Sequence, residues 1–220
     1  PIKVGSRDAL RTHYIVSEAD ILRLGVLFLG IGLLFVPVCI YRKDHLLGGV
    51  SFFVICIGCF QFFRSDLAWY LSGLDNIRFL FARMFFYLTP FGLLYFATGL
   101  FKTYARRIQQ GLLIAYTFLF LAPFSVEIMN LLGMDVWNPW RMFGYYILAL
   151  FPLALAFIAV SIYGAIVVRE PGQRTFVGGL LLFLVAVSFD LGVQATAVNY
   201  PSIAHWGLLA FALVILYILI

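Results

Sequence analysis

Charged side chains are scarce in this sequence, and their scarcity decides the class of protein. Only 11% of the 220 residues are charged, whereas 64% are hydrophobic, and mean hydropathy is +1.02. A soluble domain is about one quarter charged and about half apolar. The composition therefore excludes an ordinary soluble globular domain and predicts an integral membrane protein.

Lysine and histidine are few and widely separated, which excludes several kinds of chemistry. The lysines lie outside the long apolar runs, so none can carry a retinal Schiff base inside a span. The histidines fall in three distant places and cannot share one metal ion or haem. These residues are Lys3, Lys43 and Lys102, and His13, His45 and His205. The sequence also lacks zinc-protease, nucleophile-elbow and phosphate-loop motifs, so we predict no enzyme activity in this segment and no cofactor.

Small residues inside the apolar runs are interpreted as packing elements. Cys39, Cys56 and Cys59 lie among apolar neighbours and are typical of small buried hydrophobic residues rather than of a disulfide or metal set. The glycine pairs at 48–49 and 178–179 favour close approach of neighbouring helices.

Long apolar runs dominate what is present. A run of about 18 apolar residues is long enough to cross a bilayer as a helix. The runs are continuous rather than alternating, which favours helices over a β-barrel. We therefore predict an all-α integral membrane fold, a bundle of seven transmembrane helices, at residues 21–41, 46–63, 77–100, 111–132, 142–168, 176–197 and 203–220.

Basic residues predict the orientation of this bundle. The loops after the first, third and fifth spans carry Arg42, Lys43, Lys102, Arg106, Arg107, Arg169 and Arg174, and the other loops carry fewer basic residues. Cytoplasmic loops are enriched in lysine and arginine, so the N-terminus is predicted outside and the C-terminus in the cytoplasm. The net charge of +5 is thus interpreted as topology rather than nucleic-acid binding. The predicted location is the inner (cytoplasmic) membrane of a cell, as a multi-pass protein in contact with the lipid bilayer.

Residues 1–20 are the part of the chain that least resembles a membrane span. The segment 2–5 is interpreted as the end of a strand, and the mixed polar and apolar segment 8–20 as a short amphipathic connector. The chain begins at Pro1 without methionine and ends inside an apolar run. We therefore expect it to be the membrane domain of a longer protein, with 1–20 as an extracellular linker.

Polar side chains at membrane depth are the candidate functional residues, because they are costly in lipid. Arg83 and Asp190 each lie roughly 10 Å below the predicted outer end of their spans, at 1.5 Å per residue. All of the candidates fall in the predicted outer half: Arg64, Arg83, Glu127, Asp190, Gln194 and His205. We predict that Arg83 pairs with Asp190, with Glu127, Gln194 and His205 nearby.

Two interpretations of this cluster stay open. The first is a structural polar clamp that holds the third and sixth spans together. The second is a small polar pocket, open to the outside, that senses a ligand or a bound partner domain.

The order of several segments resembles a known family. Residues 2–10 are similar to the tail that leaves that family's extracellular domain, and 25–44 are similar to its first span and basic turn. Residues 51–64 match its second span, 189–191 the acidic position of its sixth, and 205–211 the opening of its seventh. In this order the chain resembles the transmembrane region of the bacterial seven-transmembrane receptors with diverse intracellular signalling modules (7TMR-DISM).

This resemblance implies a sensor. In that family an N-terminal extracellular sensor domain precedes the spans, and a cytoplasmic effector domain follows them. The implied effectors are a diguanylate or nucleotide cyclase, a histidine kinase or a phosphatase, and their dimeric action implies a homodimer. The predicted function is relay of an extracellular ligand or domain state to such an effector.

Two alternatives belong to other functional classes. A small-solute transporter or channel needs polar residues through the whole membrane depth and usually an internal repeat, and the predicted cytoplasmic half looks dry. An intramembrane enzyme needs convergent histidine, serine or carboxylate groups, which we do not find in the sequence.

Overall fold

The computed structural model describes residues 7–66, 75–101, 103–134, 138–167, 171–195 and 204–219. Within these ranges the secondary structure is entirely helical, as predicted. The helices are α1 (Arg7–Arg42), α2 (His45–Arg64), α4 (Asp75–Leu100), α5 (Thr103–Leu131), α6 (Pro139–Val167), α7 (Pro171–Ala195) and α8 (Ala204–Leu219).

Length and hydropathy make most of these helices suited to a membrane. Six helices in the described ranges are long and apolar enough to cross a bilayer, and Trp206–Leu219 forms a shorter apolar helix. Large apolar side chains also cover the outside of the bundle, such as Leu148, which is 77% exposed, and Phe118, which is 71% exposed. Exposed apolar area on this scale favours lipid over water as the surrounding medium. The chain is therefore a multi-pass membrane protein.

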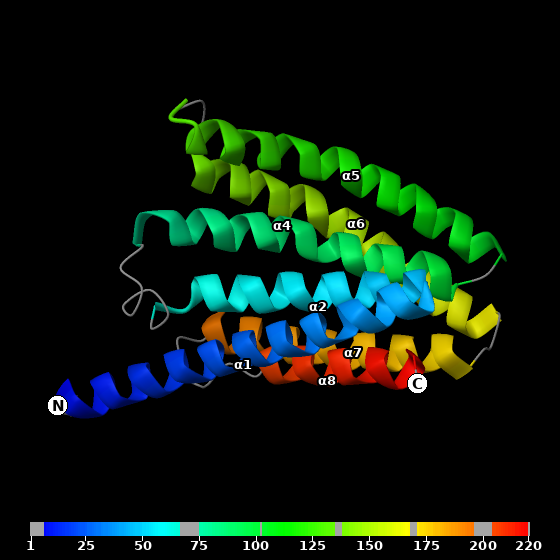
Figure 1. The fold of residues 1–220 in the computed structure, drawn as a ribbon, viewed down its shortest axis with the longest axis horizontal. Coiled ribbons are helices and arrows are strands. Elements are labelled where there is room, and N and C mark those ends of the chain that lie inside the picture. Colours follow the sequence, from blue (N-terminus) through cyan, green and yellow to red (C-terminus); the bar gives the residue numbers. More distant parts are fainter. Residues whose placement is uncertain are drawn as a thin grey trace.

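The first helix begins earlier than the sequence predicted. It starts at Arg7 and continues to Arg42, so the predicted connector at 8–20 and the predicted span at 21–41 form one helix. No glycine or proline lies between Arg7 and Gly25, so nothing interrupts the helix there. Figure 1 shows the N-terminal turns of α1 projecting beyond the other helices. The predicted strand end at 2–5 lies outside the described residues.

Glycines bring α1, α2 and α4 into backbone contact. A methyl group added at Gly58 would lie 2.6 Å from the backbone nitrogen of Leu29, and one added at Gly92 would lie 2.6 Å from that of Phe53. Such distances leave no room for any side chain, so the three helices are fixed by their backbones. The predicted packing role is confirmed for Gly49, where a methyl group would lie 3.1 Å from the backbone nitrogen of Phe96.

The seven described helices fall into two groups, and helices contact each other more within a group than between groups. Helices α1, α2, α4, α5 and α6, here called the frame, contact one another in succession, and Figure 1 shows α5 and α6 beyond α4. Helices α7 and α8, here called the hairpin, contact each other far more than they contact α6 or α2. Within the hairpin a methyl group at Gly179 would lie 2.7 Å from Val214 Cγ1, whereas Gly178 faces open space.

An aromatic hub joins the hairpin to the frame. Phe176 of α7 is fully buried, and its ring lies 5.8 Å from Phe96, 6.0 Å from Phe101 and 6.3 Å from Phe157. Phe211 of α8 lies 5.6 Å from Phe176. The joint between hairpin and frame therefore depends on side-chain packing rather than on backbone contact.

Candidate functional site

A buried ion pair joins α4 to α5. Arg83 donates from Nε to Glu127 Oε1 at 2.5 Å and from Nη2 to Oε2 at 3.0 Å, which is a two-bond guanidinium–carboxylate pair. Glu127 is 1% exposed and Arg83 is 9% exposed. Buried charges are costly unless they are paired, so each side chain stabilises the other at this depth.

Three tyrosines extend this pair across the frame. Tyr87 donates its hydroxyl to Glu127 Oε1 at 3.5 Å. Tyr116 donates its hydroxyl to the Tyr87 carbonyl oxygen, and the hydroxyls of Tyr116 and Tyr146 lie 2.6 Å apart. Because Tyr116 has a single hydroxyl proton, Tyr146 is the donor in that second bond. The result is a buried polar network that holds α4, α5 and α6 together.

The structure brings some predicted site residues together. Arg83 and Glu127 are direct partners, which locates a structural clamp between α4 and α5. Arg64 lies apart from them and lines a cavity of the bundle. The side chains of Asp190, Gln194 and His205 fall outside the described residues, so the predicted pairing of Arg83 with Asp190 stays a prediction.

A cavity of about 650 Å³ lies between the frame and the hairpin. Helices α2, α4, α5, α6, α7 and α8 all contribute to its wall. The wall is mostly apolar and aromatic, with Phe53 and Phe86 on the frame facing Phe183 and Phe211 on the hairpin. Ligand sites in proteins are typically concave, apolar and of about 300–1,000 Å³, so this cavity has the size and lining of a binding site.

Four polar side chains interrupt the apolar wall: Gln61, Arg64, Thr89 and Tyr116. Two of them are satisfied, because Thr89 donates to the Phe85 carbonyl oxygen at 2.8 Å and Tyr116 belongs to the tyrosine network. Gln61 is different: the residue is 4% exposed, and its Oε1 has no hydrogen-bond partner. Arg64 lies one helical turn further along α2, is exposed, and has no ion-pair partner within the described ranges.

Gln61 was missed at the sequence level because charged residues were given most of the weight. Its signal was present: a neutral polar residue in an apolar run, three positions before Arg64 and therefore on the same helix face. A buried acceptor without a partner costs free energy, which makes this atom the least satisfied polar group in the wall of the cavity.

The predicted cytoplasmic half is less dry than expected. Gln109 of α5 donates from Nε2 to Ser161 Oγ of α6 at 3.1 Å, and both side chains are fully buried. Gln173 of α7 donates from Nε2 to the Leu100 carbonyl oxygen at the end of α4, at 3.1 Å. The expectation of a dry half is thus corrected: neutral polar bonds tie helices together there. None of these residues lines the cavity.

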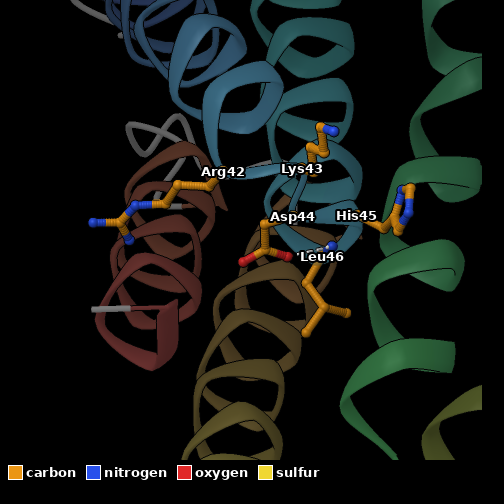
Figure 2. Close-up of a pocket in the computed structure, with 5 residues that line it drawn as sticks. All are labelled: Arg42, Lys43, Asp44, His45 and Leu46. Carbon is orange, nitrogen blue, oxygen red and sulfur yellow. Dashed lines mark hydrogen bonds between the residues drawn. The ribbon is translucent and has the colours of Figure 1, made fainter.

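The turn between α1 and α2 holds no convergent site. Figure 2 shows Arg42, Lys43 and His45 pointing away from one another around Asp44. The Asp44 carboxylate accepts from the backbone nitrogen of Leu46 at 2.9 Å and so caps the start of α2. The basic side chains are therefore free to meet solvent or lipid headgroups, as the topology prediction requires.

Metal chemistry has no support among the described side chains, where no group of three or more His, Cys, Asp or Glu residues could hold a metal ion. Comparison of the chain with protein-family models, curated proteins and solved structures gave no match. The resemblance to bacterial seven-transmembrane receptors accordingly stays a prediction.

Proposed function

We propose that this chain is the transmembrane signalling module of a bacterial sensor receptor in the inner membrane. In this proposal the chain has seven spans, with its N-terminus outside and its C-terminus in the cytoplasm. It relays the state of an extracellular ligand or sensor domain to a cytoplasmic effector such as a cyclase, kinase or phosphatase.

The observation that carries this proposal is the cavity between the frame and the hairpin. Phe211 of α8 lies at its wall, 6.2 Å from Phe53 of the frame and 5.9 Å from Phe183 of its own hairpin. Any change in the cavity's contents therefore acts on the ring that links α8 to the frame. The last helix is the element that such a receptor uses to pass its state on to an effector.

A two-part bundle supplies the physical basis for relay. The frame is fixed by backbone contacts and by a buried polar network, whereas the hairpin is joined to it by side chains. A ligand that binds better to one hairpin position shifts the population toward that position. Discrete rearrangements of packed elements are the usual way in which such shifts reach a distant domain.

A reporter fusion tests the relay. The chain is joined after Ile220 to a diguanylate cyclase catalytic domain, and cyclic dinucleotide production is measured at equal membrane abundance. Phe211→Leu is expected to change the output, because it alters the contact between α8 and the frame. Leu213→Ala is the matched control, since Leu213 lies on the same helix but is 53% exposed.

Equal output from the wild type, Phe211→Leu and Leu213→Ala would contradict relay through α8. The cavity also favours a second candidate function, a small-solute transporter, because a transporter needs an internal binding space. Uptake of radiolabelled solutes into proteoliposomes distinguishes the two: transport requires net uptake, whereas relay requires none.

A further inference from the structure

The cavity between the frame and the hairpin offers a ligand a large apolar surface and few polar groups. We propose that it holds a hydrocarbon chain of a membrane lipid, which enters from the bilayer between α6 and α7. Apolar contacts hold this chain in the cavity, without a specific hydrogen bond or ion pair. The inference names the ligand class of the proposed receptor and so rests on the proposed function, but occupancy of the cavity is measured without the relay.

Most polar atoms of the wall are engaged or out of reach. Thr89 donates to a backbone carbonyl oxygen of its own helix, and the Tyr116 hydroxyl is bonded within the tyrosine network. Gln61 Oε1 has less than 1 Å² of accessible surface, so a molecule in the cavity does not reach it. Arg64 is the last residue of α2 and is exposed, and long charged side chains at helix ends extend toward the membrane interface. The wall therefore offers little hydrogen bonding to a polar ligand.

This shortage of polar partners also disfavours water as the occupant. A buried water molecule makes about three hydrogen bonds to the protein, whereas an apolar cavity stays dry. An empty space of about 650 Å³ is unfavourable as well, because the atoms of its wall lack neighbours to contact. An apolar occupant restores these contacts and has no polar group to desolvate.

The cavity lies at the depth of the lipid chains. Phe53 of α2 and Phe211 of α8 belong to its wall. The side chains that α6 contributes fall within residues 150–157, near the middle of the helix Pro139–Val167. The middle of a spanning helix lies in the hydrocarbon core of the bilayer rather than among the headgroups. A ligand at this depth is therefore surrounded by hydrocarbon on the protein side and on the bilayer side.

The wall of the cavity is incomplete, because the space is only partly enclosed. Its lining on α6 and α7 includes Leu153, Ala154, Phe183 and Val187, which are all half-buried. Helices α6 and α7 also contact each other far less than α7 and α8 do. The boundary between α6 and α7 is therefore the side on which we place the entry of the lipid chain.

Lipid is the apolar molecule that is available at this boundary. Leu155 of α6 is 51% exposed and Val185 of α7 is 67% exposed, and each lies within two residues of a side chain that lines the cavity. These outward apolar side chains are solvated by lipid in a membrane protein. A lipid chain thus reaches the cavity without leaving an apolar medium, whereas a solute from water must first cross the interface.

Methyl NMR spectroscopy tests occupancy in the 220-residue chain. The chain is deuterated except at the isoleucine δ1-methyl groups and is placed in phosphatidylcholine nanodiscs, and the nuclear Overhauser effect from lipid-chain protons to each methyl group is measured. Ile57 lines the cavity and is 3% exposed, Ile215 is 1% exposed and does not line it, and Ile114 is 59% exposed. We expect a lipid signal at Ile57 and Ile114 and none at Ile215.

Filling the cavity assigns the signal at Ile57 to a chain inside it. Ala154→Phe should abolish the lipid signal at Ile57 and keep the signal at Ile114. Ala159→Phe is the matched control, because Ala159 lies on the same helix but is exposed and does not line the cavity, so both signals should remain. Nanodiscs of chain-deuterated lipid should abolish both signals. A signal that survives at Ile57 in those nanodiscs would come from another apolar molecule and would overturn the lipid assignment.

The proposal is also overturned if the Ile57 methyl group of the wild type receives no signal from lipid chains, or receives one from water instead. The same holds if Ala154→Phe, folded like the wild type, leaves the signal at Ile57 unchanged. The measurement uses no effector, so its failure leaves the reporter test of relay standing. Conversely, a bound lipid chain with a reporter that does not respond to Ala154→Phe would contradict relay through the cavity and not the lipid site.

Discussion

The frame and the hairpin are both tightly packed inside, but they are packed by different means. In the frame, Gly58 and Gly92 bring helix backbones together, and a buried ion pair and three tyrosines join the remaining helices. In the hairpin, Gly207 and Gly179 meet the side chains of Ala186 and Val214. Between the two parts lie aromatic rings and the cavity.

The two kinds of packing differ in how easily they rearrange. Backbone contacts and buried charge pairs have few alternative arrangements, because a small displacement loses them completely. Aromatic packing beside an open volume has more alternatives. The hairpin is also linked at one end by Gln173 and Phe176, whereas Phe183 and Val187 further along α7 line the cavity. We therefore expect motion of the hairpin about its linked end to cost less free energy than a rearrangement inside the frame.

Loss of the buried ion pair should destabilise the frame more than any other single change. Glu127→Ala leaves Arg83 buried beside an empty position and should lower the free energy of unfolding by about 3–5 kcal/mol. Chemical denaturation in detergent micelles measures the loss. The double variant Arg83→Met, Glu127→Leu should recover most of the lost stability. If Glu127→Ala alone lowers the free energy of unfolding by less than about 1 kcal/mol, the ion pair contributes little.

A second change breaks the frame at a backbone contact. Gly92→Ala places a methyl group 2.6 Å from the backbone nitrogen of Phe53 and should destabilise the protein by about 2–3 kcal/mol. Gly178→Ala is the control in the hairpin, where nothing lies within 4 Å of the added group. Because alanine favours helices over glycine, the control should be unchanged or slightly more stable. Equal losses for the two variants would remove the contrast.

A third change loosens the joint and leaves both parts intact. Phe176→Leu removes the hub of the aromatic contacts and should cost about 1 kcal/mol. Hydrogen exchange should rise in α7 and α8 but not in α2 or α4, because local opening follows the weakened contacts. Phe118→Leu, at a 71% exposed position, should leave exchange unchanged. A uniform rise over all helices would indicate one cooperative unit instead of two.

The smallest expected effect concerns the tyrosine network. Tyr146→Phe removes the donor to the Tyr116 hydroxyl and should cost about 0.6 kcal/mol, the average for interhelical hydrogen bonds in membranes. Thermal unfolding is followed by size-exclusion chromatography, with Tyr163→Phe, at a 52% exposed position of the same helix, as the control. A loss above 2 kcal/mol would give the network a larger share of frame stability than assigned here.

The helices were easier to predict from the sequence than the contacts between them. Apolar runs report membrane spans directly, because lipid forces every backbone group into helical hydrogen bonds. The same apolar runs match one another equally well, so the sequence placed Glu127 near Arg83 but did not identify it as a direct partner. Gln61 was overlooked for a related reason: its importance comes from lacking a partner, which only the packed structure reveals.

We infer that the hairpin moves as a unit against the frame around the cavity. Electron-spin distance measurements test this inference, with labels at exposed positions in a chain whose cysteines are replaced. The pairs are Phe118 with Leu148 inside the frame, Val185 with Tyr217 inside the hairpin, and Leu148 with Val185 across the joint.

Filling the cavity with Ala154→Phe should shift or narrow the distance distribution across the joint and leave the two internal distributions unchanged. An unchanged distribution across the joint, in a variant that inserts and folds like the wild type, would contradict this inference. Equal shifts in all three pairs would contradict it as well, because they would mean that the bundle deforms as a whole.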